Sequence, residues 1–192
     1  VKELREMTGA GMMDCKKALA ATDGDMEAAV DFLREKGLAG AQKKAGRIAA
    51  EGVVDVCVSD DAKKAVVVEV NAETDFVAKN ETFRNYVAEV TAQALKTDAA
   101  DVDAFLNEKW ELDDSLTVAQ KLSSMISIIG ENMSIRRFAK VEENDGCVVS
   151  YIHGGGKIGV LVDLVSDVVN DDIKEMAKNI AMQVAALKPL YT

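Results

Sequence analysis

The sequence offers few side chains for covalent catalysis. Its single histidine, His153, is the one residue that could serve as the base of a Ser–His–Asp or Cys–His arrangement, and no nucleophile can be assigned to it. The three cysteines, Cys15, Cys57 and Cys147, are far apart and form no Cys-x-x-Cys pair, as is usual for proteins of a reducing cytosol. We therefore predict no catalytic site, no metal site and no cofactor.

Three consecutive glycines and a lysine at residues 154–157 have the composition of a phosphate-binding loop. The first glycine at the P-loop spacing is missing, and Ile158 occupies the position of the Ser or Thr that would hold magnesium. The segment also lies between two predicted strands instead of before a helix. We expect a tight hairpin turn here, with His153 at its edge.

Two short sequences could bind a partner protein instead. Phe76 either packs inward or projects as an anchor, since aromatic side chains dominate interface hot spots, and its neighbour Asp75 is expected to be a helix N-cap. Met12 and Met13 are adjacent on a predicted helix and cannot both face one core. At least one methionine is therefore expected to be exposed as an adaptable contact surface.

These residues must be positioned by a helical module and a mixed core. Residues 2–37 predict three short helices, with a turn at 8–11, an N-cap at Asp25 and an end at Gly37. Leu4 and Met7 give an apolar face to the first helix, and Met12, Cys15, Ala18 and Leu19 continue at helical spacing in the second. The expected inward stripe of the third helix is Met26, Ala29, Val30 and Leu33. A core of this size leaves little room for a pocket, so the module is interpreted as an interaction domain.

After residue 50 the pattern changes to strands and longer helices. The predicted strands span 54–58, 65–70, 135–142, 147–153 and 158–165, and the predicted helices span 75–95, 117–132 and 170–187. The last three strands are expected to form an antiparallel meander. The predicted fold class is α+β, with a three-helix module at 1–40, a linker at 41–50, a core N-subdomain at 51–134 and a core C-subdomain at 135–192, with helices on one face of the sheet.

Composition narrows the classes of partner. The 192 residues carry a net charge of −10, which disfavours nucleic acid and anionic membranes as partners. Residues 98–114 hold seven acidic side chains and one basic one, and are interpreted as a solvated connection. No apolar run approaches the 18 residues of a membrane span or resembles a signal peptide. Because the sequence starts with Val1, we expect a processed or trimmed chain.

Two segments carry a resemblance to a known family. Residues 4–19, LREMTGAGMMDCKKAL, resemble the N-terminal signature of elongation factor Ts, and residues 69–79, EVNAETDFVAK, are similar to its second signature. Residues 130–132, 135–137 and 153–162 continue the match in the same order. The resemblance covers nearly the whole chain, and two independent signatures of eleven or more residues make it specific.

The resemblance implies a guanine-nucleotide exchange factor, not an enzyme of covalent chemistry. Its partner would be the translational GTPase elongation factor Tu, GDP-bound or nucleotide-free, in the bacterial cytoplasm. Residues 2–37 would form a ubiquitin-associated-like module that docks on the GTPase domain. Phe76, beside Asp75, would wedge into the partner near its magnesium site. The contact positions implied are Arg5, Met12, Met13, Lys16, Lys44, Thr74, Asp75, Phe76, Val77, Ile129, His153 and Gly154.

Members of the family commonly continue beyond residues 188–189 with a helical hairpin, further strands and often a C-terminal helix. We therefore expect this chain to be the front two-thirds of a longer protein, with an exposed sheet edge that could favour self-association. Two alternatives remain open. One is a ubiquitin-associated-like adaptor without exchange activity, and the other is an enzyme that uses His153 and the glycine turn.

Overall fold

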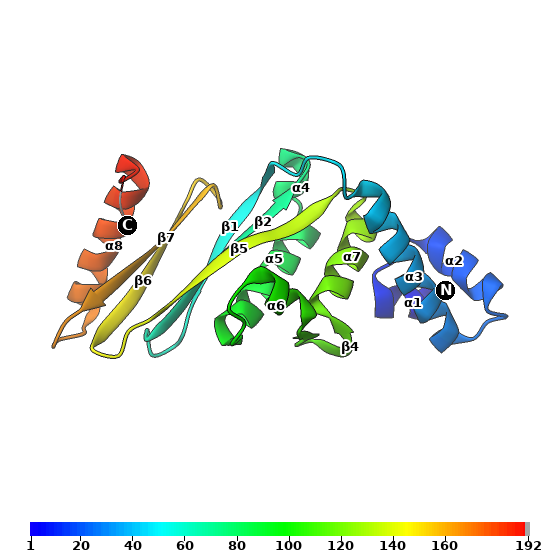
Figure 1. Ribbon diagram of the computed structural model, residues 1–192, viewed down its shortest axis with the longest axis horizontal. Coiled ribbons are helices and arrows are strands. Elements are labelled where there is room, and N and C mark those ends of the chain that lie inside the picture. The colour runs from blue at the N-terminus through cyan, green and yellow to red at the C-terminus, as the bar shows by residue number, and fades with distance from the viewer. Residues whose placement is uncertain (191–192) are drawn as a thin grey trace. The chain divides into compact units, whose positions relative to one another are not determined.

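The computed structural model describes residues 1–190 and has the predicted α+β class (Figure 1). By their contacts, the helices and strands form two compact units. The first unit consists of Val1–Ala49 and Leu106–Met133, and the second consists of residues 50–105 and 134–190. The four-part division of the chain expected from the sequence stays a prediction.

The first unit is built on three N-terminal helices, α1 (Lys2–Thr8), α2 (Met12–Ala21) and α3 (Met26–Lys44). Its core is made of buried residues from all three helices, namely Leu4, Cys15, Ala18 and Ala29, with Leu19, Met26, Val30 and Leu33 packed against them. Asp25 caps α3 as predicted, because its side chain accepts a hydrogen bond from the Ala28 amide at 2.9 Å. The three-helix prediction is therefore confirmed.

The predicted end of the third helix at Gly37 is wrong. Helix α3 continues to Lys44, and the buried Gly37 packs against α7 (Val118–Ile129). A Cβ atom at Gly37 would lie 3.7 Å from the Ser123 carbonyl oxygen, an ordinary van der Waals distance, so this position lies in the contact between α3 and α7 instead of ending the helix. The predicted linker 41–50 accordingly begins inside this helix.

The acidic segment is more ordered than a solvated connection. It contains α6 (Val102–Asn107) and a small hairpin, β3 (Lys109–Trp110) and β4 (Asp113–Thr117). Phe105 and Trp110 are buried, and Lys121 of α7 lies 5.8 Å from the Trp110 ring centroid. The two large aromatic side chains anchor this segment, while six of its seven acidic residues are exposed, so the segment is solvated as predicted but also contains regular structure.

The second unit contains a three-stranded sheet in the order β1 (Glu51–Val58), β2 (Lys64–Ala72) and β5 (Met133–Glu142). Strands β1 and β2 form the predicted antiparallel hairpin, and α5 (Glu81–Lys96) packs against them (Figure 1). A second antiparallel pair, β6 (Gly146–His153) and β7 (Ile158–Val165), packs against α8 (Asp171–Leu187).

The predicted meander of the last three strands is wrong in one respect. Strand β5 joins β2, and only β6 and β7 pair with each other. Glu69 of β2 provides a physical reason, since its carboxylate lies 2.6 Å from Arg137 Nε and 3.8 Å from Arg136 Nε on β5. Buried Met133 and Ile135 add apolar contacts at the start of β5.

The predicted long helix at 75–95 is also interrupted. Helix α4 (Asp75–Ala78) ends before Lys79, and α5 begins at Glu81. Asn80 has extended backbone angles, and its side-chain oxygen accepts a hydrogen bond from the Phe83 amide at 3.1 Å. This N-cap separates Phe76 from the long helix and places it on a four-residue helix of its own.

Candidate functional site

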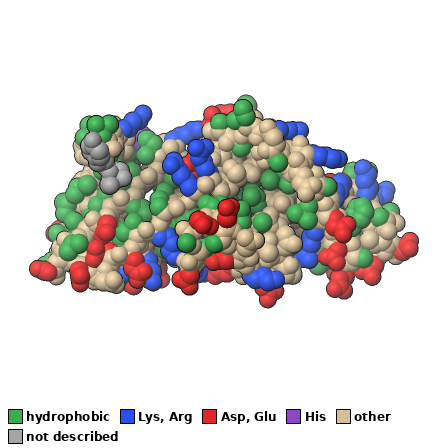
Figure 2. Space-filling view, in the orientation of Figure 1, with side chains coloured by type: hydrophobic (Ala, Val, Ile, Leu, Met, Phe, Trp, Pro, Cys, Tyr) green, Lys and Arg blue, Asp and Glu red, His purple; other side chains and the backbone are tan. Residues whose placement is uncertain are grey.

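The most exposed aromatic side chain of the second unit lies on α4. Phe76 is 82% exposed although it follows a strand that is largely buried. In Figure 2, hydrophobic side chains with acidic ones beside them lie at the top of the view, where Figure 1 labels α4. The structure thus decides between the two expectations for Phe76, because the ring projects outward instead of packing inward.

The short helix that carries Phe76 is well supported. Thr74 is its N-cap, and the threonine hydroxyl accepts a hydrogen bond from the Val77 amide at 3.3 Å. Ala78 is buried, Val77 is half-buried, and the helix packs against β1 and β2. The supporting residues hold the Phe76 backbone in place, so the exposed side chain projects from a supported helix.

Asp75 is the first residue of α4, and the prediction that it is the N-cap is wrong because Thr74 has that role. Its Oδ2 atom accepts a hydrogen bond from Lys79 Nζ at 2.9 Å. This hydrogen bond and the charge of Lys79 hold the pKa of the Asp75 carboxyl below its ordinary value, and the charge of Lys157 adds to the lowering. The exposed carboxylate is therefore ionised next to Phe76.

His153 and Gly154 begin the tight turn that the sequence predicted between β6 and β7. His153 pairs with Ile158 in the strand register, and the Lys157 amide donates to the His153 carbonyl at 3.1 Å. The His153 ring is exposed, with its Nδ1 atom 2.9 Å from the Tyr151 hydroxyl. Gly154 has φ +61, a left-handed conformation that suits glycine. The geometry is that of an exposed tight turn.

The first unit carries the other six predicted site residues. Met12 and Met13 are 59% and 63% exposed, which confirms the expectation that at least one faces solvent. Arg5 and Lys16 are also exposed. Two predicted contacts are half-buried, namely Lys44, whose Nζ lies 3.4 Å from the Gly40 carbonyl, and Ile129, at the end of α7.

The sequence interpretation missed one exposed methionine. Met7 was expected in the helical core, but it is 63% exposed, because Leu4 alone fills the α1 side of that core. The Leu4–Met7 spacing fits a helical stripe, and only the packed structure shows that the stripe ends after one residue.

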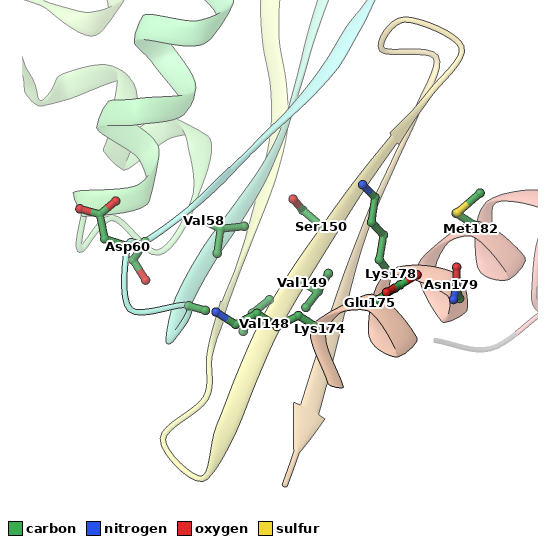
Figure 3. Close-up of a pocket in the computed structure, with 12 residues that line it drawn as sticks. Val58, Asp60, Val148, Val149, Ser150, Lys174, Glu175, Lys178, Asn179 and Met182 are labelled. Atoms are coloured by element: carbon green, nitrogen blue, oxygen red, sulfur yellow. The ribbon is translucent and has the colours of Figure 1, made fainter. Parts of the chain in front are cut away.

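A groove of about 730 Å³ lies in the second unit, between the β1–β2 turn, β6 and α8. Figure 3 shows Lys178, Glu175 and Asn179 on one side of it and Val58 and Asp60 on the other. A smaller apolar groove of about 370 Å³ follows α8, where Met176, Ile180 and Leu187 are exposed. Neither groove is lined by a residue of the predicted site.

Residues 1–190 contain neither a cluster of metal-binding side chains nor a membrane-spanning helix. Within that range, His, Cys, Asp and Glu side chains form no group of three or more that could hold a metal ion. In the same range, every helix is too short or too polar to span a bilayer.

Comparisons with known proteins agree with the resemblance seen in the sequence. The family model described as Elongation factor TS matches residues 73–192, more than half of the chain. Elongation factor Ts of Clostridium novyi (strain NT) is 55% identical over 191 residues, which cover 100% of this chain and 62% of that protein. Elongation factor Ts of Halothermothrix orenii is 54% identical, with 100% and 63% covered. The chain thus spans about 62% of the length of these relatives, and it belongs to the elongation factor Ts family.

Proposed function

We propose that this chain binds elongation factor Tu and promotes the release of its GDP, so that GTP can bind in its place. The observation that carries the proposal is the 82% exposure of Phe76 on a short helix whose backbone is held by buried neighbours. Exposing a large apolar ring to water is unfavourable, so an exposed ring on a supported backbone suits a partner's pocket. Thr74 and Val77 are proposed to support the helix that carries Phe76, and Asp75 is proposed to contact the partner beside the ring.

The proposed action is displacement, not covalent chemistry. GDP in a GTPase is held by backbone amides around its phosphates and by Mg²⁺. Phe76 would enter the partner near that magnesium site and separate its switch structure, while the Asp75 carboxylate adds a negative charge there. The nucleotide and the exchange factor would then each weaken the binding of the other by the same ratio. A 10⁴-fold effect needs about 5.5 kcal/mol of differential contact energy.

The first unit has a different part in the proposal, which is to supply affinity. The exposed methionines Met12 and Met13 give an adaptable apolar contact, and the exposed cations Arg5 and Lys16 add positive charge to the same helices. The three helices would dock as a ubiquitin-associated-like module on the GTPase domain. Lys44, Ile129, His153 and Gly154 are proposed as further contacts.

The proposed setting is the bacterial cytoplasm, with elongation factor Tu as the partner in its GDP-bound and nucleotide-free forms. Nucleic acid and membranes are not proposed as partners, because the net charge of −10 repels both phosphate backbones and anionic lipids. The chain spans about 62% of its relatives' length. That these 192 residues accelerate nucleotide release on their own is therefore part of the proposal.

The test is stopped-flow release of a fluorescent GDP from elongation factor Tu at increasing concentrations of the chain. We expect the chain to raise the release rate to a plateau. We expect Phe76→Ala to lower the plateau by about 30-fold or more, since truncating a hot-spot aromatic costs about 2–4 kcal/mol. Val165→Ala is the matched control, because Val165 is 71% exposed in the same unit and belongs to no proposed contact.

The alternative functions give different results in the same experiment. An adaptor without exchange activity would bind elongation factor Tu and leave the release rate at its intrinsic value. If Phe76→Ala leaves the maximal release rate unchanged, the proposed action of α4 is overturned, and the proposal that the chain binds elongation factor Tu still stands.

A further inference from the structure

The turn between β6 and β7 is fastened to the start of β1. The Val54 amide donates a hydrogen bond to the Gly156 carbonyl at 2.7 Å, and Lys157 Nζ lies 2.9 Å from the Glu51 carboxylate. Gly156 has φ +98, and a Cβ atom there would lie 3.1 Å from Val53 Cβ. The turn that begins at the exposed His153 is thus seated closely on β1.

Arg84 connects the same turn to the helices that follow Phe76. Its Nη2 atom donates a hydrogen bond to the Gly155 carbonyl at 2.7 Å, across 71 residues of sequence. The Arg84 amide donates to the Asn80 carbonyl at 3.0 Å, and Asn80 is the residue that joins α4 to α5. The Lys79 amide in turn donates to the Phe76 carbonyl at 3.2 Å. Phe76 and the glycine turn are therefore linked through α4, the Asn80 cap and the Arg84 side chain.

Strand β1 holds the turn near α4 independently of Arg84, because α4 packs against β1 and the turn is bonded to Val54 and Glu51 of the same strand. Lys79 is the main cause of the lowered pKa of Asp75, but the charge of Lys157, on the turn, contributes to it. The two elements proposed to contact elongation factor Tu in this unit are therefore neighbours.

We propose that Arg84 is a positioning residue that fixes the His153–Gly154 turn relative to Phe76, so that both meet elongation factor Tu as one preformed surface. The inference rests on the proposed function. Ordering a loop during binding weakens the complex, and holding it in the bound arrangement beforehand removes that cost. A guanidinium–carbonyl hydrogen bond suits this role because a charged donor makes a stronger bond than a neutral one. Arg84 itself need not touch the partner.

The test is a double-mutant cycle on the release of fluorescent GDP from elongation factor Tu. Phe76→Ala, His153→Ala and their combination are measured in the full chain, with Arg84 retained and with Arg84→Ala. With Arg84 present, each residue depends on the placement of the other. We therefore expect the fold-loss of release rate in the double variant to be about fivefold smaller than the product of the fold-losses in the two single variants. With Arg84→Ala, we expect this departure from additivity to disappear.

Two controls separate positioning from general destabilisation. Lys64→Ala removes another exposed cation, which lies 3.3 Å from the Glu142 carboxylate at the other end of β2, and should preserve the non-additivity. Amide hydrogen exchange should become faster at residues 153–157 in Arg84→Ala while the thermal unfolding temperature stays the same. A merely structural Arg84 would lower that temperature and leave the coupling between Phe76 and His153 unchanged.

The outcomes distinguish the two proposals. If the parent chain accelerates release and the coupling is equal with and without Arg84, the role of Arg84 is overturned and the proposed function stands. If the parent chain does not accelerate release at any concentration, the proposed function fails and the role of Arg84 fails with it.

Discussion

Lys79 Nζ lies 2.9 Å from Asp75 Oδ2, and the two residues of this ion pair flank Phe76 in the sequence. Both side chains are at least half exposed, so the pair is screened by solvent. The hydrogen bond orients the Asp75 carboxylate and lowers its pKa from the ordinary value. This arrangement allows the role of the carboxylate to be separated from the role of the ion pair.

We expect Asp75→Asn to lower the maximal rate of GDP release more than Lys79→Ala does. Exposed ion pairs contribute little, so Lys79→Ala should change the rate less than about fivefold. Asp75→Asn also removes the charge proposed to act near the partner's magnesium ion. Stopped-flow release with saturating variant measures both effects, and equal losses would mean that Asp75 acts only through its pair with Lys79.

The methionines of α2 should determine affinity and not the exchange step. Met12→Ala is expected to weaken binding of elongation factor Tu by about fivefold to thirtyfold, the range for truncating an interface contact. Because Met12 is 59% exposed, the fold should not be affected. Titration calorimetry gives the affinity, with Met182→Ala, at a 45% exposed methionine outside the proposed contacts, as control. Unaltered affinity would contradict the assignment of Met12.

Glu69 should make the stability of the second unit depend on pH. Burial raises the pKa of this carboxyl, but hydrogen bonds from Arg137 and Asn71 and the charges of Arg137 and Arg136 outweigh it, and the pKa lies below its ordinary value of 4.5. Since the folded-state pKa is lower than the unfolded one, the carboxylate stabilises the fold fully above about pH 4.5. The contribution is lost as the pH falls through the folded-state pKa.

Urea unfolding of the parent chain and of Glu69→Gln tests this dependence. At about pH 7 the variant should be less stable, and at about pH 3.5 the difference should be smaller. Glu35→Gln is the control, since Glu35 is exposed on α3, and its effect should be near zero at both values. A difference that does not change with pH would show that Glu69 acts through shape and not through charge.

Gly52 should be essential for the hairpin that supports α4. It has φ +136, and a Cβ atom there would lie 2.1 Å from the Val70 carbonyl oxygen on the partner strand. Gly52→Ala must therefore displace backbone, and we expect a loss of about 1–3 kcal/mol in the free energy of unfolding. Urea denaturation checks this, with Gly46→Ala as control because a Cβ atom at Gly46 would meet no atom within 4 Å. Equal stability of both variants would contradict the close approach.

Several features of the fold could be predicted because they depend on local sequence. The three N-terminal helices, the β1–β2 hairpin and the β6–β7 turn follow from apolar spacing and from turn residues such as Gly154. The end of the third helix could not be predicted in this way. Gly37 is common at helix ends, but here it is a point of contact with α7, and only the position of that distant helix decides the matter.

The candidate site shows the same division. Asp75 and Phe76 are recognised from the sequence alone, since they stand in a segment similar to a family signature. Their presentation depends on Asn80, whose N-cap interrupts the helix and gives Phe76 a separate support. A helical periodicity that runs through residues 75–95 hides this interruption, because the cap is one side-chain hydrogen bond.

The sequence by itself determined the fold class, the helical module and the family, because these follow from local spacing and from two long, specific segments. Only the tertiary structure decided that Phe76 is exposed, that β5 pairs with β2, and that Arg84 reaches the Gly155 carbonyl. Each of these depends on groups far apart in the chain. Their free energies come from packing and hydrogen bonds that exist only after folding, so no local pattern of residues encodes them.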